Sequence, residues 1–171
     1  MDIQQFLRKH KAGIIENGEF ASTVFCDHDD GVQRRCDVSS INTCSTSFER
    51  QKALFLLGRD YGLKHSSHVH TLSLVSEMWS SYNESFDTPA DDPARKEVLC
   101  FLTLEADKGE QTMRSVEMIR DVRTDHLIDL VPIAGYMDNA ESNLLISFLA
   151  GVASAKMNDS ELEDFIRQYT S

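Results

Sequence analysis

Apolar positions recur with helical spacing in four segments of the chain. In residues 2–15, Ile3 and Phe6 belong to a face that repeats every three or four residues, and Asn17-Gly18 then interrupts it. A glycine directly after a periodic run often ends a helix, because it adopts the left-handed conformation without strain. The pattern therefore predicts a first helix over residues 2–15.

The second helical segment starts with a capping signal. Thr46 and Glu49 have the spacing of a capping box, in which the hydroxyl and the carboxylate each accept a hydrogen bond from a backbone amide at the helix start. Helical spacing of apolar residues continues to Tyr61, and Gly62 follows. We expect this helix to be closed by Gly62.

Two further helices are expected near the C-terminus. Asp138 and Glu141 repeat the capping arrangement ahead of an apolar run that extends to Val152. That run is apolar over a wide arc, which is typical of a buried helix. Residues 158–160 then precede a short last helix with one apolar face.

Apolar and β-branched residues predict strands between these helices. A hairpin is expected over residues 19–38 with its turn at Asp29-Asp30-Gly31, and a longer strand over residues 69–79. Residues 97–106 and 111–120 form the clearest hairpin. The strands thus fall into a hairpin and a group of three that are sequential along the chain.

The register of the hairpin over residues 97–120 depends on its turn. A two-residue turn at Lys108-Gly109 sets Glu97 opposite Arg120, whereas a three-residue turn sets Val98 opposite Met118. We favour the three-residue turn, in which Gly109 forms a bulge, because it gathers apolar residues of both strands on one core face. That face comprises Val98, Cys100, Leu102, Leu104, Val116 and Met118.

The order of these elements indicates an α+β fold. One domain is expected for residues 1–171, since a chain of this length buries roughly 70% of the surface that it exposes when unfolded. The sheet is predicted to be largely antiparallel, with about five strands in a hairpin and a three-stranded meander, and to be covered by about four helices.

Charge and composition narrow the choice of partners. With 17 basic and 28 acidic residues, the net charge of −11 opposes binding to phosphate backbones, so generic nucleic-acid binding is not expected. No apolar run approaches the roughly 20 residues of a membrane span, and the first residues lack the features of a signal peptide. The four cysteines include no Cys-x-x-Cys pair, which favours free thiols. These features predict a cytoplasmic protein that does not bind membranes.

The histidines supply one candidate metal site. His68 and His70 lie two residues apart on one face of the predicted strand, a spacing that lets both imidazoles bind one metal ion. A carboxylate or a third histidine, such as His28 or His126, would be needed to complete the site. The alternative is that both are polar residues at the exposed start of a strand, and we assign no metal cofactor on this pattern.

A second candidate site flanks the connection over residues 80–96. Loops longer than about 12–15 residues are uncommon in compact domains and are often functional. Pairing of the flanking strands would bring four side chains to one edge of the sheet, where we expect them to bind a ligand or a partner: Glu77, Trp79, Arg95 and Glu97. The alternative is a loop held by an Arg95–Glu77 ion pair, with Trp79 packed beneath it.

Three short strings around these residues resemble a known family. They are Val75-Ser76-Glu77-Met78-Trp79, the segment from Asp92 to Leu99, and Ile119-Arg120-Asp121. This set is similar to an uncharacterised bacterial and archaeal family with an E-A-W motif, a P-x-R-x-E motif and a later R-D pair, although Met78 stands where the family has alanine. The resemblance covers about a third of the chain. It implies the strand-loop-strand-strand arrangement and implies no activity.

No recognised nucleotide-binding, nucleophile or metal motif occurs in the sequence. We therefore favour a non-catalytic module that binds a protein partner, with an origin in a phage or mobile element as one hypothesis. Pairing with a second copy could use an exposed edge strand or the apolar last helix. One alternative is a metal-dependent hydrolase that uses His68 and His70 with carboxylates such as Glu77. Another is an acidic inhibitor that mimics nucleic acid.

Overall fold

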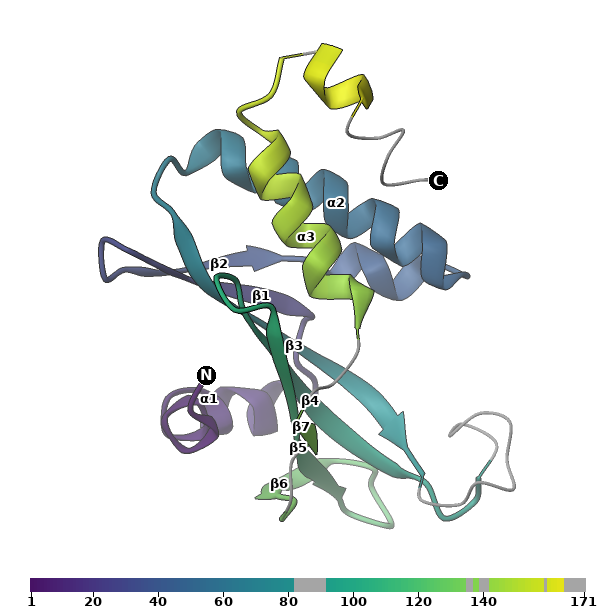
Figure 1. Ribbon diagram of the computed structural model, residues 1–171. Helices are drawn as coiled ribbons and strands as arrows, with labels where there is room; N and C mark the ends of the chain where they lie inside the picture. The colour runs from purple at the N-terminus through teal and green to yellow at the C-terminus, as the bar shows by residue number, and fades with distance from the viewer. Residues whose placement is uncertain (82–91, 135–136, 139–141, 159, 165–171) are drawn as a thin grey trace.

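A curled antiparallel sheet is the centre of the fold (Figure 1). The computed structural model describes residues 1–81, 92–134, 137–138, 142–158 and 160–164. In chain order the elements are α1 (Ile3–Asn17), β1 (Thr23–His28), β2 (Gln33–Asp37), the 3-10 helix η1 (Ser39–Thr43), α2 (Ser47–Lys64), β3 (Val69–Ser80), β4 (Lys96–Glu105), β5 (Glu110–Arg120), β6 (Leu127–Pro132), β7 (Met137–Asp138) and α3 (Asn143–Ser154).

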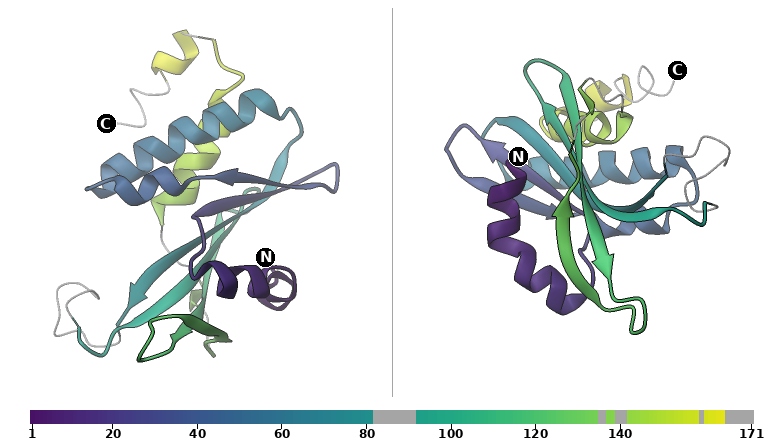
Figure 2. Two further views of the ribbon diagram at one scale, coloured as in Figure 1. Left: turned by 180° about the vertical axis from the view of Figure 1, so that it is seen from behind. Right: turned by 90° about the horizontal axis from the view of Figure 1, so that it is seen from below.

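Six strands lie in the order β2-β1-β3-β4-β5-β6, and the short β7 pairs with β5. Every recorded pairing is antiparallel. Helices α2 and α3 cover one face of the sheet, and α1 lies against the other face (Figure 2). The predicted α+β class with a largely antiparallel sheet is confirmed. Among the described residues, no helix combines the length and apolar character needed to cross a bilayer.

The core on the α2–α3 face is built from alternate residues of the central strands. Leu72 and Leu74 of β3 belong to one buried cluster with Leu54 of α2 and Phe148 of α3. Each such side chain contributes about 1.5–3 kcal/mol when it is fully removed from water. The predicted capping box of α2 is present, because Thr46 and Glu49 exchange hydrogen bonds with the backbone.

Helix α1 buries its apolar stripe on the opposite face. Asp2 caps its start. Gly18 follows its last residue in the left-handed conformation, as the Asn17-Gly18 signal predicts. The ring of Phe6 packs edge-on against Phe25 and Phe101, with ring centroids 6.0 and 4.9 Å apart. Both faces of the sheet are therefore covered by apolar contacts.

The β4–β5 hairpin has neither of the two predicted registers. Glu105 pairs with Glu110, so the turn contains the four residues 106–109. Within it, Lys108 and Gly109 both donate their backbone N–H to the carbonyl of Glu105, and Gly109 has a φ of 71°. Val98 consequently pairs with Glu117 rather than Met118. A shift of one residue moves side chains to the other face. Val116 and Met118 thus pack in the α1 core, and the predicted common face with Leu102 and Leu104 is wrong.

The sheet also has more strands than the predicted five. β6 and β7 occupy a stretch in which the sequence shows no regular pattern, and β6 pairs with the end of β5. The cap of α3 differs as well. Asp138 belongs to β7, and the side chain of Ser142 accepts the N–H of Leu144 at the helix start. Glu141 lies outside the described residues.

Helices α2 and α3 cross with their backbones in close contact at three glycines. Gly62 does not close α2, which continues to Lys64. Instead, Gly58, Gly62 and Gly151 line the crossing, where a Cβ on any of them would lie within 3.0 Å of the other helix. The absence of side chains at these positions lets the two backbones touch.

Candidate functional site

Three of the four predicted site residues share one face at one end of two central strands. Trp79 of β3 lies directly opposite Glu97 of β4, and Glu77 lies opposite Leu99. Leu99 belongs to the core covered by α1, so this is the α1 face of the sheet. β3 and β4 are interior strands of the sheet, but β1 pairs with β3 only as far as Val75, so Glu77 and Trp79 lie beyond the end of β1 and pair with β4 alone.

Arg120 at the end of β5 binds the Glu97 carboxylate with two hydrogen bonds. Its Nε lies 2.5 Å and its Nη2 2.9 Å from the two carboxylate oxygens. The same guanidinium donates to the carbonyls of Gly18, at 3.0 Å, and of Asp125, at 3.2 Å. Arg120 thereby connects β4, the end of α1 and the turn after β5. Such a two-pronged contact is among the stronger charge-assisted hydrogen bonds.

Glu77 is half-buried beside this ion pair. Its carboxylate accepts the backbone N–H of Phe20 at 2.5 Å. Burial raises the pKa of Glu77, and the nearby charge of Glu97 raises it further, whereas the Phe20 hydrogen bond and Arg120 act in the opposite direction. Glu77 is therefore a carboxyl group whose ionisation is opposed by its surroundings.

We expect Glu77→Gln to increase the free energy of unfolding at neutral pH and to have little effect below the unfolded pKa of glutamate, about 4.3. Because the folded pKa is raised, the protonated carboxyl contributes stability below that pH, and the contribution is lost as pH rises through the folded pKa. Glutamine keeps an oxygen that accepts the Phe20 N–H. Urea unfolding over a pH series measures the difference, with the exposed Glu16→Gln as control. An increase in the free energy of unfolding that does not depend on pH would contradict this account.

Trp79 is the exposed member of the site. Its side chain is 45% exposed, and the guanidinium of Arg95 lies 4.5 Å from the centre of its ring. The alternative of an Arg95–Glu77 ion pair is wrong, because none of the ion pairs between described residues joins these two side chains. Arg95 instead stacks on Trp79 in a cation–π contact.

The predicted loop over residues 80–96 is described only at its two ends, and residues 82–91 lie outside the described part. Ser81 donates a hydrogen bond to the buried carboxylate of Asp92, which also accepts the N–H of Ala94 at 2.8 Å. These contacts join the end of β3 to the segment that leads into β4. Arg95 is thus positioned by a backbone turn fixed at Asp92.

A shallow hollow lies next to Phe20, between α1 and the segment before β1. Its volume is about 200 Å³, and its lining residues are His10, Gly13, Ile14, Asn17, Glu19, Phe20 and Ala21. Pockets for small molecules usually measure about 300–1,000 Å³. The hollow is small for such a ligand.

The structure does not gather His68 and His70 into a metal site. His68 is exposed and pairs with Asp107 at 3.2 Å, while Nδ1 of His70 contacts the hydroxyl of its neighbour Thr71 at 3.1 Å. Within the described part of the chain, no three His, Cys, Asp or Glu side chains lie close enough together to hold a metal ion. His68 has one carboxylate neighbour, and neither histidine belongs to a group of three potential ligands among the described residues.

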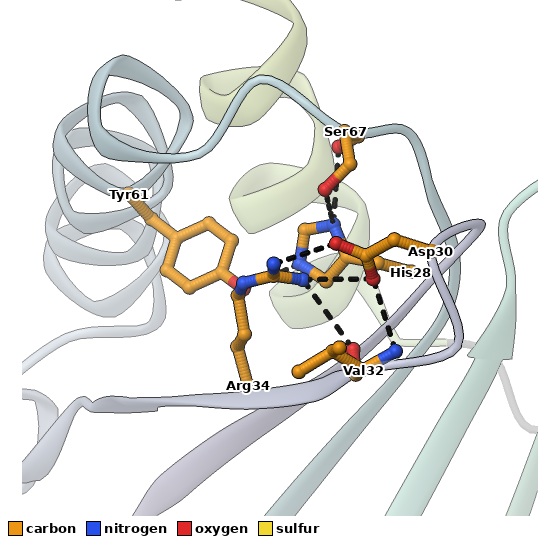
Figure 3. Close-up of polar contacts among 6 residues, drawn as sticks. All are labelled: His28, Asp30, Val32, Arg34, Tyr61 and Ser67. Carbon is orange, nitrogen blue, oxygen red and sulfur yellow. Dashed lines mark hydrogen bonds and ion pairs between the residues drawn. The ribbon is translucent and has the colours of Figure 1, made fainter.

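His28, considered above as a further metal ligand, has both ring nitrogens engaged elsewhere (Figure 3). Its Nε2 lies 2.6 Å from the hydroxyl of Tyr61, and its Nδ1 lies 3.0 Å from the carbonyl and 2.8 Å from the hydroxyl of Ser67. Because a carbonyl only accepts, Nδ1 carries the proton and Nε2 accepts from Tyr61. Burial raises the pKa of the adjacent Cys26 thiol to about 12, so that thiol is neutral.

This buried network connects three segments that are distant in sequence. His28 ends β1, Tyr61 belongs to α2, and Ser67 precedes β3. In the hairpin beside it, Asp30 receives two hydrogen bonds from the guanidinium of Arg34, at 3.0 and 2.6 Å (Figure 3). The arrangement satisfies the buried polar groups, and its contacts are those of a structural network.

Comparison with known protein families, with curated proteins and with solved structures finds no significant match. The resemblance to a family with E-A-W and P-x-R-x-E motifs remains a prediction. The structure does place the three strings that carry it side by side. They contribute Glu77 and Trp79 from β3, Arg95 from the residue before β4, Glu97 from the start of β4, and Arg120 from β5.

Proposed function

We propose that the chain is a non-catalytic module that binds a protein partner, and that it does so through the end of the sheet formed by Trp79 and Arg95. The observation that carries the proposal is the Trp79 ring, which is 45% exposed and has the Arg95 guanidinium stacked on it. The strands beneath the ring are held by the hydrogen bonds of Glu77 on β3 and Glu97 on β4. Trp and Arg are the residues most enriched among those that dominate binding energy at protein interfaces.

The turn between β5 and β6 supports this proposal. It lies at the same end of the sheet, because Arg120 at the end of β5 binds Glu97 at the start of β4. Its tip carries a fully exposed apolar side chain, Val122. The carboxylate of Asp121 accepts hydrogen bonds from the backbone of Arg123 and Thr124, which fixes the turn. A rigid exposed apolar tip beside an exposed Trp suits contact with a protein surface.

The four cysteines are unpaired, which agrees with the proposed location in a reducing compartment such as the cytoplasm. The net charge of −11 makes a basic surface on the partner favourable for association.

Replacement of Trp79 tests the proposal. A photo-reactive residue at position 122 would capture the partner in an extract of the source cells, and the purified partner would then be titrated against variants. We expect Trp79→Ala to weaken binding by about thirtyfold, or about 2 kcal/mol, and Arg95→Ala by about tenfold. Met78→Ala is the matched control, since Met78 is 46% exposed and its side chain leaves the strand on the opposite face. Equal affinities of Trp79→Ala and the unmodified chain would contradict the proposal.

A further inference from the structure

A second exposed surface runs along the outer side of α2. Three large apolar side chains on this helix are more than half exposed: Phe48 at 65%, Leu56 at 55% and Leu63 at 65%. The opposite side of α2 buries Leu54 and Tyr61 in the core, so the exposed residues lie on the side of the helix away from that core. Several large apolar side chains exposed on one side of a helix are a feature of interaction surfaces.

Two opposite charges flank the centre of this surface symmetrically. Lys52 stands four residues before Leu56 and Asp60 four residues after it, so both share the helix face of Leu56. Both are exposed, and Asp60 pairs with Lys64 at 2.5 Å. Lys52 forms no ion pair with any described residue. We call Phe48, Lys52, Leu56, Asp60 and Leu63 the outer stripe.

We propose that the outer stripe is a homodimer interface, in which two copies of α2 pack antiparallel about a two-fold axis at Leu56. In a two-fold interface each residue meets the symmetry-related position of the other copy. Leu56 then contacts Leu56 of the other copy, and Lys52 of each copy contacts Asp60 of the other. Phe48 contacts the last helical turn of the other α2, which contains Leu63. The stripe is therefore complementary to itself in both charge and apolar contact.

The dimensions and charges of α2 favour a second copy as the occupant. The helix has 18 residues and is about 27 Å long, so an antiparallel pair buries the exposed apolar side chains of both copies along most of its length. Each copy carries a net charge of −11, which repels the other. At physiological salt, with a Debye length of about 8 Å, that repulsion between distant charges is screened, whereas two pairs of Lys52 and Asp60 in contact are screened much less.

The solution mass of the full chain gives the first test. Analytical ultracentrifugation from low to high micromolar concentration should show a mass near twice 19.3 kDa for the unmodified chain. Leu56→Asp places two carboxylates at the axis and should give the monomer mass. Ile146→Asp is the matched control, because Ile146 is an exposed apolar residue of α3 outside the stripe and its replacement should leave the dimer intact.

Charge reversal tests the two-fold axis itself. Lys52→Asp and Asp60→Lys should each weaken self-association by about tenfold or more, because like charges then meet across the axis. An equal mixture of the two variants should restore a dimer, since each reversed charge then meets an opposite one in the other copy. Because the altered residues are exposed, circular dichroism should show the fold unchanged.

Three outcomes would overturn the proposal: a monomeric unmodified chain over the whole concentration range, a dimer that persists in Leu56→Asp, and a mixture of charge variants that stays monomeric. The proposal is independent of the partner surface at Trp79. Trp79→Ala should leave the mass unchanged, and failure of either proposal leaves the other in place.

Discussion

Gly58→Ala is expected to lower the free energy of unfolding by about 3 kcal/mol or more. A Cβ at this position would lie 2.1 Å from the carbonyl oxygen of Phe148 and 2.9 Å from its carbonyl carbon. Overpacked cores lose about 1–3 kcal/mol when side chains can adjust, but here the obstacle is the backbone of α3. Relief requires the two helices to move apart, which opens the core around Leu54 and Phe148. Urea unfolding followed by circular dichroism measures the effect.

Two further glycine variants complete this test. Gly151→Ala approaches the same crossing from α3, where its Cβ would lie 2.0 Å from the carbonyl oxygen of Phe55, so we expect a loss of similar size. Gly13→Ala is the control, because Gly13 lies within α1 and has no neighbouring atom within 4 Å of the added methyl. It should stabilise the protein by about 0.5–1 kcal/mol through helix propensity. A Gly58→Ala protein as stable as the parent chain would show that the helices do not approach this closely.

The helix crossing shows why local signals mispredict one helix end. Gly62 follows an apolar periodic run, and in isolation that position predicts a helix end. Its function is instead tertiary, because α3 approaches α2 along the line of Gly58 and Gly62. The four-residue spacing of Gly58 and Gly62 is compatible with a helix end and with a close helix crossing. Only the position of Gly151, nearly ninety residues away, distinguishes them.

The β4–β5 register could not be predicted because β4 is apolar on both faces. Val98 to Leu102 is an unbroken apolar run, since α1 covers one face of the sheet and α2 with α3 the other. The sequence of β4 therefore has no alternation of apolar and polar residues that could indicate the strand register, and the register depends on the number of residues in the turn. The turn contains four residues, one more than the favoured choice, so the predicted face is reversed for β5.

The candidate site could be predicted in part, because strand ends come together whenever neighbouring strands pair. That rule placed Trp79 and Glu97 next to one another, and the structure pairs them directly. It did not identify Arg120 as the partner of Glu97. The disfavoured two-residue turn sets these two residues opposite each other, and the ion pair forms in the observed register because the long Arg120 side chain reaches back along the strand.

Loss of His28 is expected to be among the most destabilising changes in the chain, although no local sequence pattern indicates that this residue is buried. The segment from Cys26 to Asp30 has the composition of a solvated hairpin tip. Asp29 and Asp30 are exposed as this composition suggests, but His28 is only 1% exposed. Its partners Tyr61 and Ser67 lie 33 and 39 residues away, so no local pattern indicates them.

His28→Ala should therefore reduce the free energy of unfolding by about 3 kcal/mol or more, since it leaves a cavity and removes the acceptor of the buried Tyr61 hydroxyl. Thermal and urea unfolding provide the measurement. The exposed His126→Ala serves as control and should change stability by less than about 0.5 kcal/mol.

A double-mutant cycle separates the hydrogen bond from the packing. Tyr61→Phe alone should cost about 1–2 kcal/mol, because His28 Nε2 then has no donor. His28→Leu alone should cost more, because the buried Tyr61 hydroxyl then keeps only the weakly polar Cys26 thiol as a neighbour. When both groups are removed, neither is left unsatisfied, so the double variant should cost less than the sum of the single variants by about 1 kcal/mol or more. Strictly additive costs would show that the two side chains contribute only by filling space. A coupling of the expected size would show that the hydrogen bond itself, and not only packing, stabilises the contact between the end of β1 and α2.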